Sequence, residues 1–194
     1  MTPTPTDAAG AIRAALLEAG WTLAFDGASF LHPEMKLVIL NDPAGLLGLE
    51  TIWHHEFGIG STLFGIDPGT GRRYRRAQSE RWAVKLANLP AATILAAAST
   101  TWDTASGTVP EQLIAAGWSH DVDTHTDPGE YLLERSWASS DRLRTVVFQA
   151  PCRHEPATWV IKRPRPGSPS TSWIDGVEAT GNTPPAIIAA VATS

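Results

Sequence analysis

Cysteine is almost absent from this sequence, since Cys152 is the only one among 194 residues. A single cysteine can form neither an internal disulfide nor a thiolate zinc site. The stretch Met1–Asp7 has no basic and no apolar region, so it does not predict a secretory signal. No apolar run approaches the ~18 residues that suggest a membrane span. These absences predict a cytoplasmic protein without a membrane partner.

The sequence is also poor in charge, with 18% charged residues where about a quarter is usual. Fifteen basic residues stand against 20 acidic ones, giving a formal net charge of −5. Proteins that coat duplex nucleic acid non-specifically are usually basic overall, because phosphate neutralisation supplies most of their affinity. The charge balance therefore argues against that role but leaves a local basic face possible. Hydrophobic residues make up 43%, which is enough for a packed core.

What the sequence does contain is a repeat. The stretch Leu16–Trp21 (LLEAGW) recurs as Leu113–Trp118 (LIAAGW). Each copy predicts the end of a helix, a C-terminal glycine and a tryptophan that opens a strand. A second pair, Asn88–Ala98 and Asn182–Val191, predicts an Asn or Thr cap, a proline near the first helical position and an Ala/Ile helix. The chain is therefore predicted to be two tandem units, at residues 1–99 and 109–194, joined by a linker at residues 100–108.

Between these helices, stretches rich in Val, Ile, Thr, Trp and Phe alternate with Pro/Gly turns. They predict strands at Trp21–Phe25, Lys36–Asn41, Leu49–Phe57, Ser61–Ile66, Arg81–Ala87, Ser119–Thr124, Tyr131–Ser136, Leu143–Ala150, Thr158–Arg163 and Ser172–Ala179. The predicted fold class is α+β. Each unit is expected to be a four- to five-stranded antiparallel sheet with a C-terminal helix, and the two units to pack as a pseudo-two-fold pair.

The tryptophans divide into two groups. Those that recur between the repeats are predicted to pack in the core: Trp21, Trp82, Trp118 and Trp173. Trp53, Trp102 and Trp137 have no secure counterpart and are predicted at surface or linker positions.

The second unit resembles an actinobacterial family known only as domain of unknown function 317, whose members often carry two copies in tandem. The resemblance rests on Ser139-Ser-Asp141, Trp159-Val-Ile161, Trp173 and Asn182–Ala190. The first unit matches at His32-Pro-Glu34, Trp82 and Asn88-Leu-Pro90, whereas its middle, Gly48–Ser79, departs from the pattern. The resemblance implies a tandem architecture, and the family has no established activity that it could imply for this chain.

Basic residues cluster at matching places in the two repeats. One run comprises Arg72, Arg73, Tyr74, Arg75 and Arg76, and the other comprises Lys162, Arg163 and Arg165. Each run precedes the predicted last strand of its unit, and Tyr74 and neighbouring tryptophans could stack bases as single-strand binders do. The competing interpretation is a pair of solvated hairpin turns that keep an edge strand from aggregating.

Other chemistry-bearing residues carry weaker hypotheses. The neighbours His54 and His55 of a predicted strand point to opposite faces, so they cannot share one metal. Asp121, Asp123 and His125 alternate and would share one face, where they could hold a divalent ion; a polar strand end is the favoured interpretation. Cys152 with His154 lacks a third catalytic partner. The glycines of the 58–71 stretch lack a P-loop ending and indicate turns.

The sequence thus predicts a non-catalytic binding protein with no catalytic residues, no metal site and no cofactor. The favoured ligand is single-stranded nucleic acid, bound through the two basic runs. The alternative is a protein–protein interaction module with no nucleic-acid role, which the acidic net charge and the sheet edges favour. The sequence does not set the oligomeric state.

Overall fold

A computed structural model describes residues 5–29, 32–54, 58–66, 80–86, 89–101, 107–125, 131–152, 155–163 and 177–194. The chain divides into two compact units, Met1–Ser99 and Thr100–Ser194, here called unit 1 and unit 2. The described residues contain four helices and ten strands, and all the strand pairs within each unit are antiparallel. The predictions of an α+β fold and of antiparallel sheets are confirmed.

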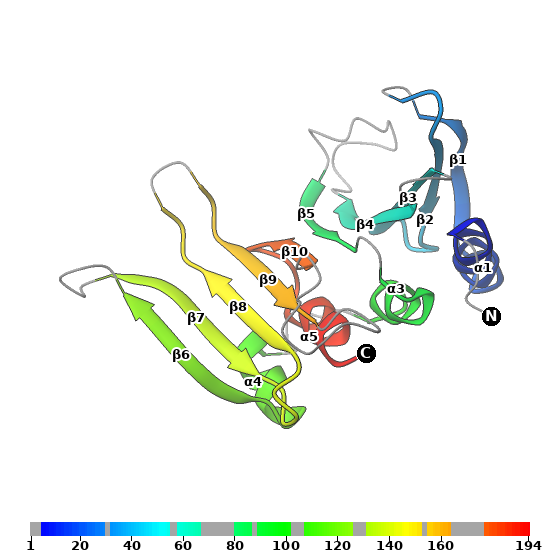
Figure 1. Cartoon of the computed structure of the whole chain (residues 1–194). Helices are drawn as coiled ribbons and strands as arrows, with labels where there is room; N and C mark the ends of the chain where they lie inside the picture. Colours follow the sequence, from blue (N-terminus) through cyan, green and yellow to red (C-terminus); the bar gives the residue numbers. More distant parts are fainter. Residues whose placement is uncertain are drawn as a thin grey trace. The chain divides into compact units, whose positions relative to one another are not determined.

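The two units have the same order of elements (Figure 1): a helix, five strands that pair in sequence order, and a second helix. Unit 1 comprises α1 (Pro5–Glu18), β1 (Thr22–Ala28), β2 (Lys36–Asn41), β3 (Leu47–His54), β4 (Gly58–Ile66), β5 (Glu80–Lys85) and α3 (Ala91–Ala98). Unit 2 comprises α4 (Val109–Ala115), β6 (Ser119–His125), β7 (Leu132–Ala138), β8 (Thr145–Gln149), β9 (Thr158–Lys162), β10 (Val177–Thr180) and α5 (Pro185–Thr193). Each of the ten predicted strands overlaps one of these ten, and residues 55–57, 87 and 172–176 of the predicted strands lie outside the described residues.

The Gly-Trp repeats end the first helix of each unit in the same way. Gly20 (φ 87°) and Gly117 (φ 82°) take the left-handed conformation that residues with a Cβ adopt at a cost. In each case the tryptophan that follows donates its backbone N–H to a helix carbonyl five residues earlier, at 2.9 Å. The chain therefore turns sharply from helix to strand, and Trp21 and Trp118 become buried.

One row of residues across each sheet forms the core beneath the helices. In unit 1 the register pairs Leu40 with Leu49, Leu49 with Leu63, and Leu63 with Val84. The matching row of unit 2 is Trp137, Val146, Ile161 and Val177. All eight side chains are at most 4% exposed. The helices α1 and α3 contact β4, α4 contacts β6, and α5 contacts β9, so each unit has its own helix-covered core.

Two predictions need correction. The helices α3 and α5 have no side-chain cap from Asn or Thr, because Pro90 and Pro184 occupy the N-cap positions in an extended conformation. Trp137, predicted at a surface or linker position, is only 3% exposed because it belongs to the core row. Trp102 and Trp173 lie outside the described residues. No helix in the described part of the chain is long and apolar enough to cross a membrane.

Candidate functional site

The two predicted basic runs fall in the same connection of each unit. Arg72, Arg73, Tyr74, Arg75 and Arg76 lie in the sequence between β4 and β5, outside the described residues. Lys162 and Arg163 lead from β9 towards β10, and Arg165 again lies outside the described residues. The runs are therefore equivalent in topology, each between the fourth and fifth strands of its unit.

Lys162 and Arg163 have different environments, because neighbouring residues of an extended chain point to opposite faces. Lys162 ends β9 and is exposed. Arg163 is 9% exposed, and its Nη2 donates to the main-chain oxygen of Ser194. Burial, together with the nearby charge of Arg144, lowers the pKa of Arg163.

Arg144 also binds main-chain oxygens at the C-terminal end of α5. Its Nη1 donates to the main-chain oxygens of Ala192 at 3.0 Å and Ser194 at 3.3 Å. Two guanidinium groups thus lie at the C-terminal end of α5, where cations interact favourably with exposed carbonyl groups and with the helix dipole. Arg163 therefore stabilises the packing of α5 against the sheet.

The other sequence hypotheses find little support. Asp121 binds Arg142 (2.7 Å) and Asp123 binds Arg135, so the two carboxylates are engaged by different arginines. Among the residues that the structure describes, no group of three or more His, Cys, Asp or Glu side chains could hold a metal ion. His55, Glu56 and His154 lie outside the described residues, and Cys152 is exposed.

The structure reveals an equivalence that the sequence analysis missed. Asp26 and Asp123 follow Trp21 and Trp118 by the same five positions, and both lie on the edge strand of their unit. Each occupies the row next to the core row, because Asp26 pairs with Val38 and Asp123 pairs with Arg135. The recurring pattern Gly-Trp-x4-Asp is the sequence signal that would have identified them.

A bulge in each edge strand places these aspartates on the helix-covered face. In β1 three steps lead from Leu23 to Asp26, while the paired β2 takes two, from Leu40 to Val38. The same shift in β6 separates His120 from Asp123. Without the extra residue an i,i+3 pair would point to opposite faces. The bulge thus allows His120 and Asp123 to meet.

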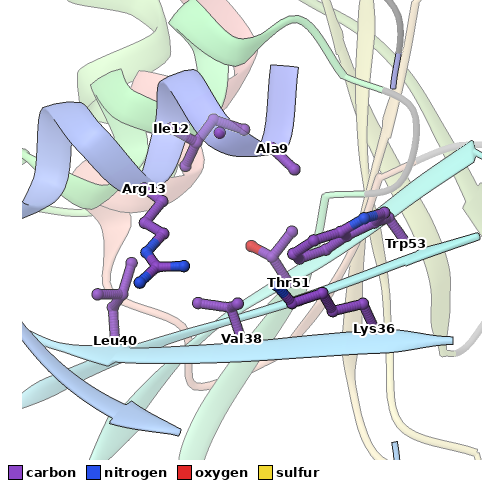
Figure 2. Close-up of a pocket in the computed structure, with 9 residues that line it drawn as sticks. Ala9, Ile12, Arg13, Lys36, Val38, Leu40, Thr51 and Trp53 are labelled. Atoms are coloured by element: carbon purple, nitrogen blue, oxygen red, sulfur yellow. The ribbon is translucent and has the colours of Figure 1, made fainter. Parts of the chain in front are cut away.

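In unit 1 the carboxylate of Asp26 joins the first helix to the sheet. Arg13, from α1, donates from Nη1 to Oδ2 at 2.6 Å, and Lys36 lies 3.1 Å from Oδ1. The Lys36 ammonium also lies 5.4 Å from the centroid of the Trp53 ring, within cation–π range (Figure 2). The hydrogen bond from Lys36, followed by that from Arg13, keeps the pKa of Asp26 below its ordinary value against the opposing effect of desolvation. Two cations therefore share one carboxylate.

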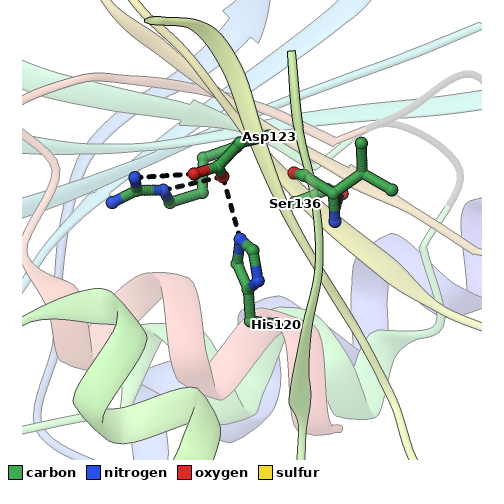
Figure 3. A network of polar contacts seen from close by, with 5 residues as sticks. His120, Asp123 and Ser136 are labelled. Atoms are coloured by element: carbon green, nitrogen blue, oxygen red, sulfur yellow. Dashed lines mark hydrogen bonds and ion pairs between the residues drawn. The ribbon is translucent and has the colours of Figure 1, made fainter.

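In unit 2 the carboxylate of Asp123 is held by Arg135 and His120 (Figure 3). Arg135 donates from Nε to Oδ1 at 2.9 Å and from Nη2 to Oδ2 at 2.8 Å, and His120 Nε2 lies 2.8 Å from Oδ1. Hydrogen bonds from Arg135 and then from His120 hold the pKa of Asp123 far below its usual range. With three donors on its oxygens, Asp123 is a poor proton acceptor at neutral pH and acts as an anchor.

Aromatic side chains fill the space beside this network. The rings of Trp137 and Trp159 have centroids 6.0 Å apart, and Phe148 lies 4.8 Å from Trp159. His120 meets the Trp137 ring edge-on at 6.3 Å. Ser136 completes the bulge, since its hydroxyl accepts from Val122 N at 3.2 Å and lies 3.3 Å from Val122 O.

No protein-family model, curated protein or solved structure matches this chain.

Proposed function

We propose that the protein is a non-catalytic binding protein that holds single-stranded nucleic acid through its two basic runs. The observation that carries this proposal is their topological equivalence. Two units with the same strand order place their arginine-rich stretches in the same connection, between the fourth and fifth strands. Exposed residues of a connection can change at little cost to the core, so positive charge that recurs in matching connections, apart from the buried Arg163, supports a shared use.

The charge distribution supports a local rather than a global interaction. Because the net charge is −5, affinity for phosphates must come from the runs themselves. Within the second run Lys162 is exposed, whereas Arg163 is occupied at Ser194, so Lys162 is the better candidate for a phosphate contact. Tyr74, within the first run, would supply a ring on which a base can stack.

Three further expectations belong to this proposal. The two units pack as a pseudo-two-fold pair, which would let one strand contact both runs. The resemblance to the domain of unknown function 317 family reflects a common tandem architecture. The protein acts in the cytoplasm.

The proposal is tested by titrating a fluorescent single-stranded oligonucleotide with the full chain at several salt concentrations. Binding should weaken steeply with salt, and the slope of log K against log salt should fall by about 0.7 for each phosphate contact removed. The variant Arg72/Arg73/Arg75/Arg76→Gln should abolish binding, and Lys162→Gln should reduce the slope. Arg142→Gln is the matched control, because Arg142 is an exposed arginine of unit 2 outside both runs. Absence of binding at low salt, or an Arg142→Gln effect as large as that of Lys162→Gln, would refute the proposal.

The alternative is a protein–protein interaction module. The edge strand β6 favours it, because six of its seven residues are exposed and Val122 exposes 53% of its surface. Capture of a protein partner that survives the four-arginine substitution, with no oligonucleotide binding, would support this alternative.

A further inference from the structure

Unit 1 contains a partly enclosed cavity of about 170 Å³ between α1 and the strands β2 and β3 (Figure 2). Its apolar wall includes Ile12 from the helix, Val38 and Leu40 from β2, and the indole of Trp53 from β3. Cavities of ~150 Å³ lined by apolar side chains accommodate a benzene ring. The cavity is therefore large enough for one small ring or a short branched chain and too small for a nucleotide.

The rim of the cavity carries unbalanced positive charge. Arg13 and Lys36 both line it, and both are paired with the single carboxylate of Asp26. The cluster therefore has one positive charge in excess. The side chains of Arg13 and Lys36 remain 34% and 49% exposed, so an incoming anion can reach them from solvent. A cation would meet two like charges at the same place.

The described strand residues at the equivalent positions of unit 2 differ from those that line this cavity. The row that follows Asp26 across the sheet is Val38, Thr51 and Ser61, whereas the row that follows Asp123 is Arg135, Phe148 and Trp159. Two aromatic rings thus occupy the positions of two small hydroxyl residues. The positions equivalent to Lys36 and Trp53 hold Leu133 and Ala150, which meet through a backbone hydrogen bond of 2.8 Å.

The first helices of the two units differ as well. The helix α1 has 14 residues and α4 has 7, although both end at the equivalent glycines. The part of α1 that roofs the cavity, from Ala9 to Arg13, corresponds to positions 106–110, and α4 begins only at Val109. The length of the helix, the strand residues and the charged residues at the cavity therefore all differ from those at the equivalent, described positions of unit 2.

We propose that this cavity binds a small monocarboxylate with an aromatic or short branched apolar body. The carboxylate lies at the rim, against Arg13 and Lys36, and the apolar body packs against Val38, Leu40 and the Trp53 ring. The Thr51 hydroxyl, which lies 3.2 Å from that of Ser61, borders the same space. This inference concerns unit 1 alone and is independent of nucleic-acid binding.

The test uses benzoate as the probe, with benzyl alcohol and acetate as matched neutral and non-aromatic ligands. Each is titrated into the full ¹⁵N-labelled chain, and the indole N–H signal of Trp53, assigned by its loss in Trp53→Phe, is followed. Benzoate should shift this signal with a Kd on the order of 1 mM, as expected for so small a ligand. Benzyl alcohol and acetate should each bind at least about tenfold more weakly, because each lacks one half of the recognition.

Two variants import residues of unit 2 into unit 1. Lys36→Leu removes the excess charge, so it should weaken benzoate binding at least about tenfold and leave benzyl alcohol binding within about twofold. Thr51→Phe fills the space and should abolish binding of both, with a dispersed NMR spectrum showing that the variant is folded. Lys162→Leu removes a charge from unit 2 and should change nothing at Trp53.

Three results would overturn the proposal: benzoate shifts confined to signals other than those around Trp53, equal affinity for benzoate and acetate, or undiminished benzoate binding by Lys36→Leu. Because Lys36 is half exposed, its substitution tests the proposal even if Thr51→Phe does not fold.

Discussion

The pairing of Gly48 with Phe64 predicts a large cost for the smallest possible substitution. The two residues are directly opposite each other on β3 and β4, and the Phe64 ring lies over the glycine. A Cβ added at Gly48 would stand 2.3 Å from Cζ and 2.4 Å from Cε2 of that ring, where ordinary contact is 3.4–4 Å. The ring must therefore move by more than about 1 Å, and Phe64 is only 4% exposed.

The magnitude follows from two opposing effects. Overpacking a buried site costs about 1–3 kcal/mol. Replacing glycine by alanine also restricts the unfolded chain, which recovers about 0.4–1 kcal/mol. We therefore expect Gly48→Ala to lower the free energy of unfolding of unit 1 by about 1–2 kcal/mol. Gly60→Ala on β4 is the control, because a Cβ there meets nothing within 4 Å; it should be neutral or stabilising by up to about 1 kcal/mol.

Native-state hydrogen exchange suits this measurement, because it reports each unit separately. The amides of Leu49 and Leu63, both fully buried, report unit 1, and that of Val146 reports unit 2 as an internal reference. In Gly48→Ala, the protection of the Leu49 and Leu63 amides from exchange should fall, whereas that of Val146 should not change. A double-mutant cycle with Phe64→Leu should recover about 1 kcal/mol, because the shorter side chain leaves room for the new methyl group. An unchanged unfolding free energy for Gly48→Ala, or no coupling with Phe64→Leu, would refute the reasoning.

Three further predictions concern residues of unit 2, and the last of them includes the equivalent residue of unit 1. Because the pKa of Asp123 is depressed in the folded protein, its ion pairs contribute stability above the unfolded pKa of about 3.9, and this contribution is lost as pH falls towards the folded pKa. Asp123→Asn should therefore flatten the decline of the unfolding free energy below about pH 4, as measured by urea titrations. Arg163→Ala should lower the free energy of unfolding of unit 2 by about 1–3 kcal/mol, because it removes the contact that holds α5. Lys162→Ala should change that free energy by no more than about 0.5 kcal/mol, and equal effects of the two substitutions would contradict the inward position of Arg163. Arg142 adopts a left-handed backbone conformation (φ 59°) at the position where unit 1 has Gly45 (φ 70°). Arg142→Gly should therefore be neutral or stabilising by up to about 1 kcal/mol, although it removes an exposed ion pair with Asp121. The reverse substitution, Gly45→Arg, should destabilise unit 1 by about 1–2 kcal/mol.

The backbone architecture was accessible from the sequence because local chemistry determines it. Helix termination at Gly20 and Gly117 needs only a residue that tolerates positive φ, and a stretch rich in Val, Ile, Thr, Trp and Phe between Pro/Gly turns identifies a strand without reference to its neighbours. The cap prediction failed for a local reason as well. Pro90 and Pro184 have no N–H of their own, so each can stand at the helix start in an extended conformation without a polar cap.

The recurring Gly-Trp-x4-Asp pattern was available in the sequence, but the partners of the two aspartates were not, because these partners come from other elements of the fold. Asp123 meets Arg135 from the neighbouring strand, whereas Asp26 meets Arg13 from the helix before it. A bulge also reverses the expected face, and simple alternation grouped Asp123 with Asp121 instead of His120. Only the register of the strands shows which side chains meet.

The two units have similar apolar residues in one row of the sheet and different residues in the neighbouring row. The core row is aliphatic or aromatic in both and lies beneath the helices, so substitutions there are limited by packing. The neighbouring row keeps its aspartate, but Val38, Thr51 and Ser61 of unit 1 stand against Arg135, Phe148 and Trp159 of unit 2. These differences at three adjacent positions change both the side-chain volume and the charge of the row. The first helix also differs, since α1 of unit 1 is twice as long as α4 of unit 2. The difference between the rows therefore follows the difference between the small residues that lie at or beside the cavity of unit 1 and the aromatic rings at the equivalent positions of unit 2.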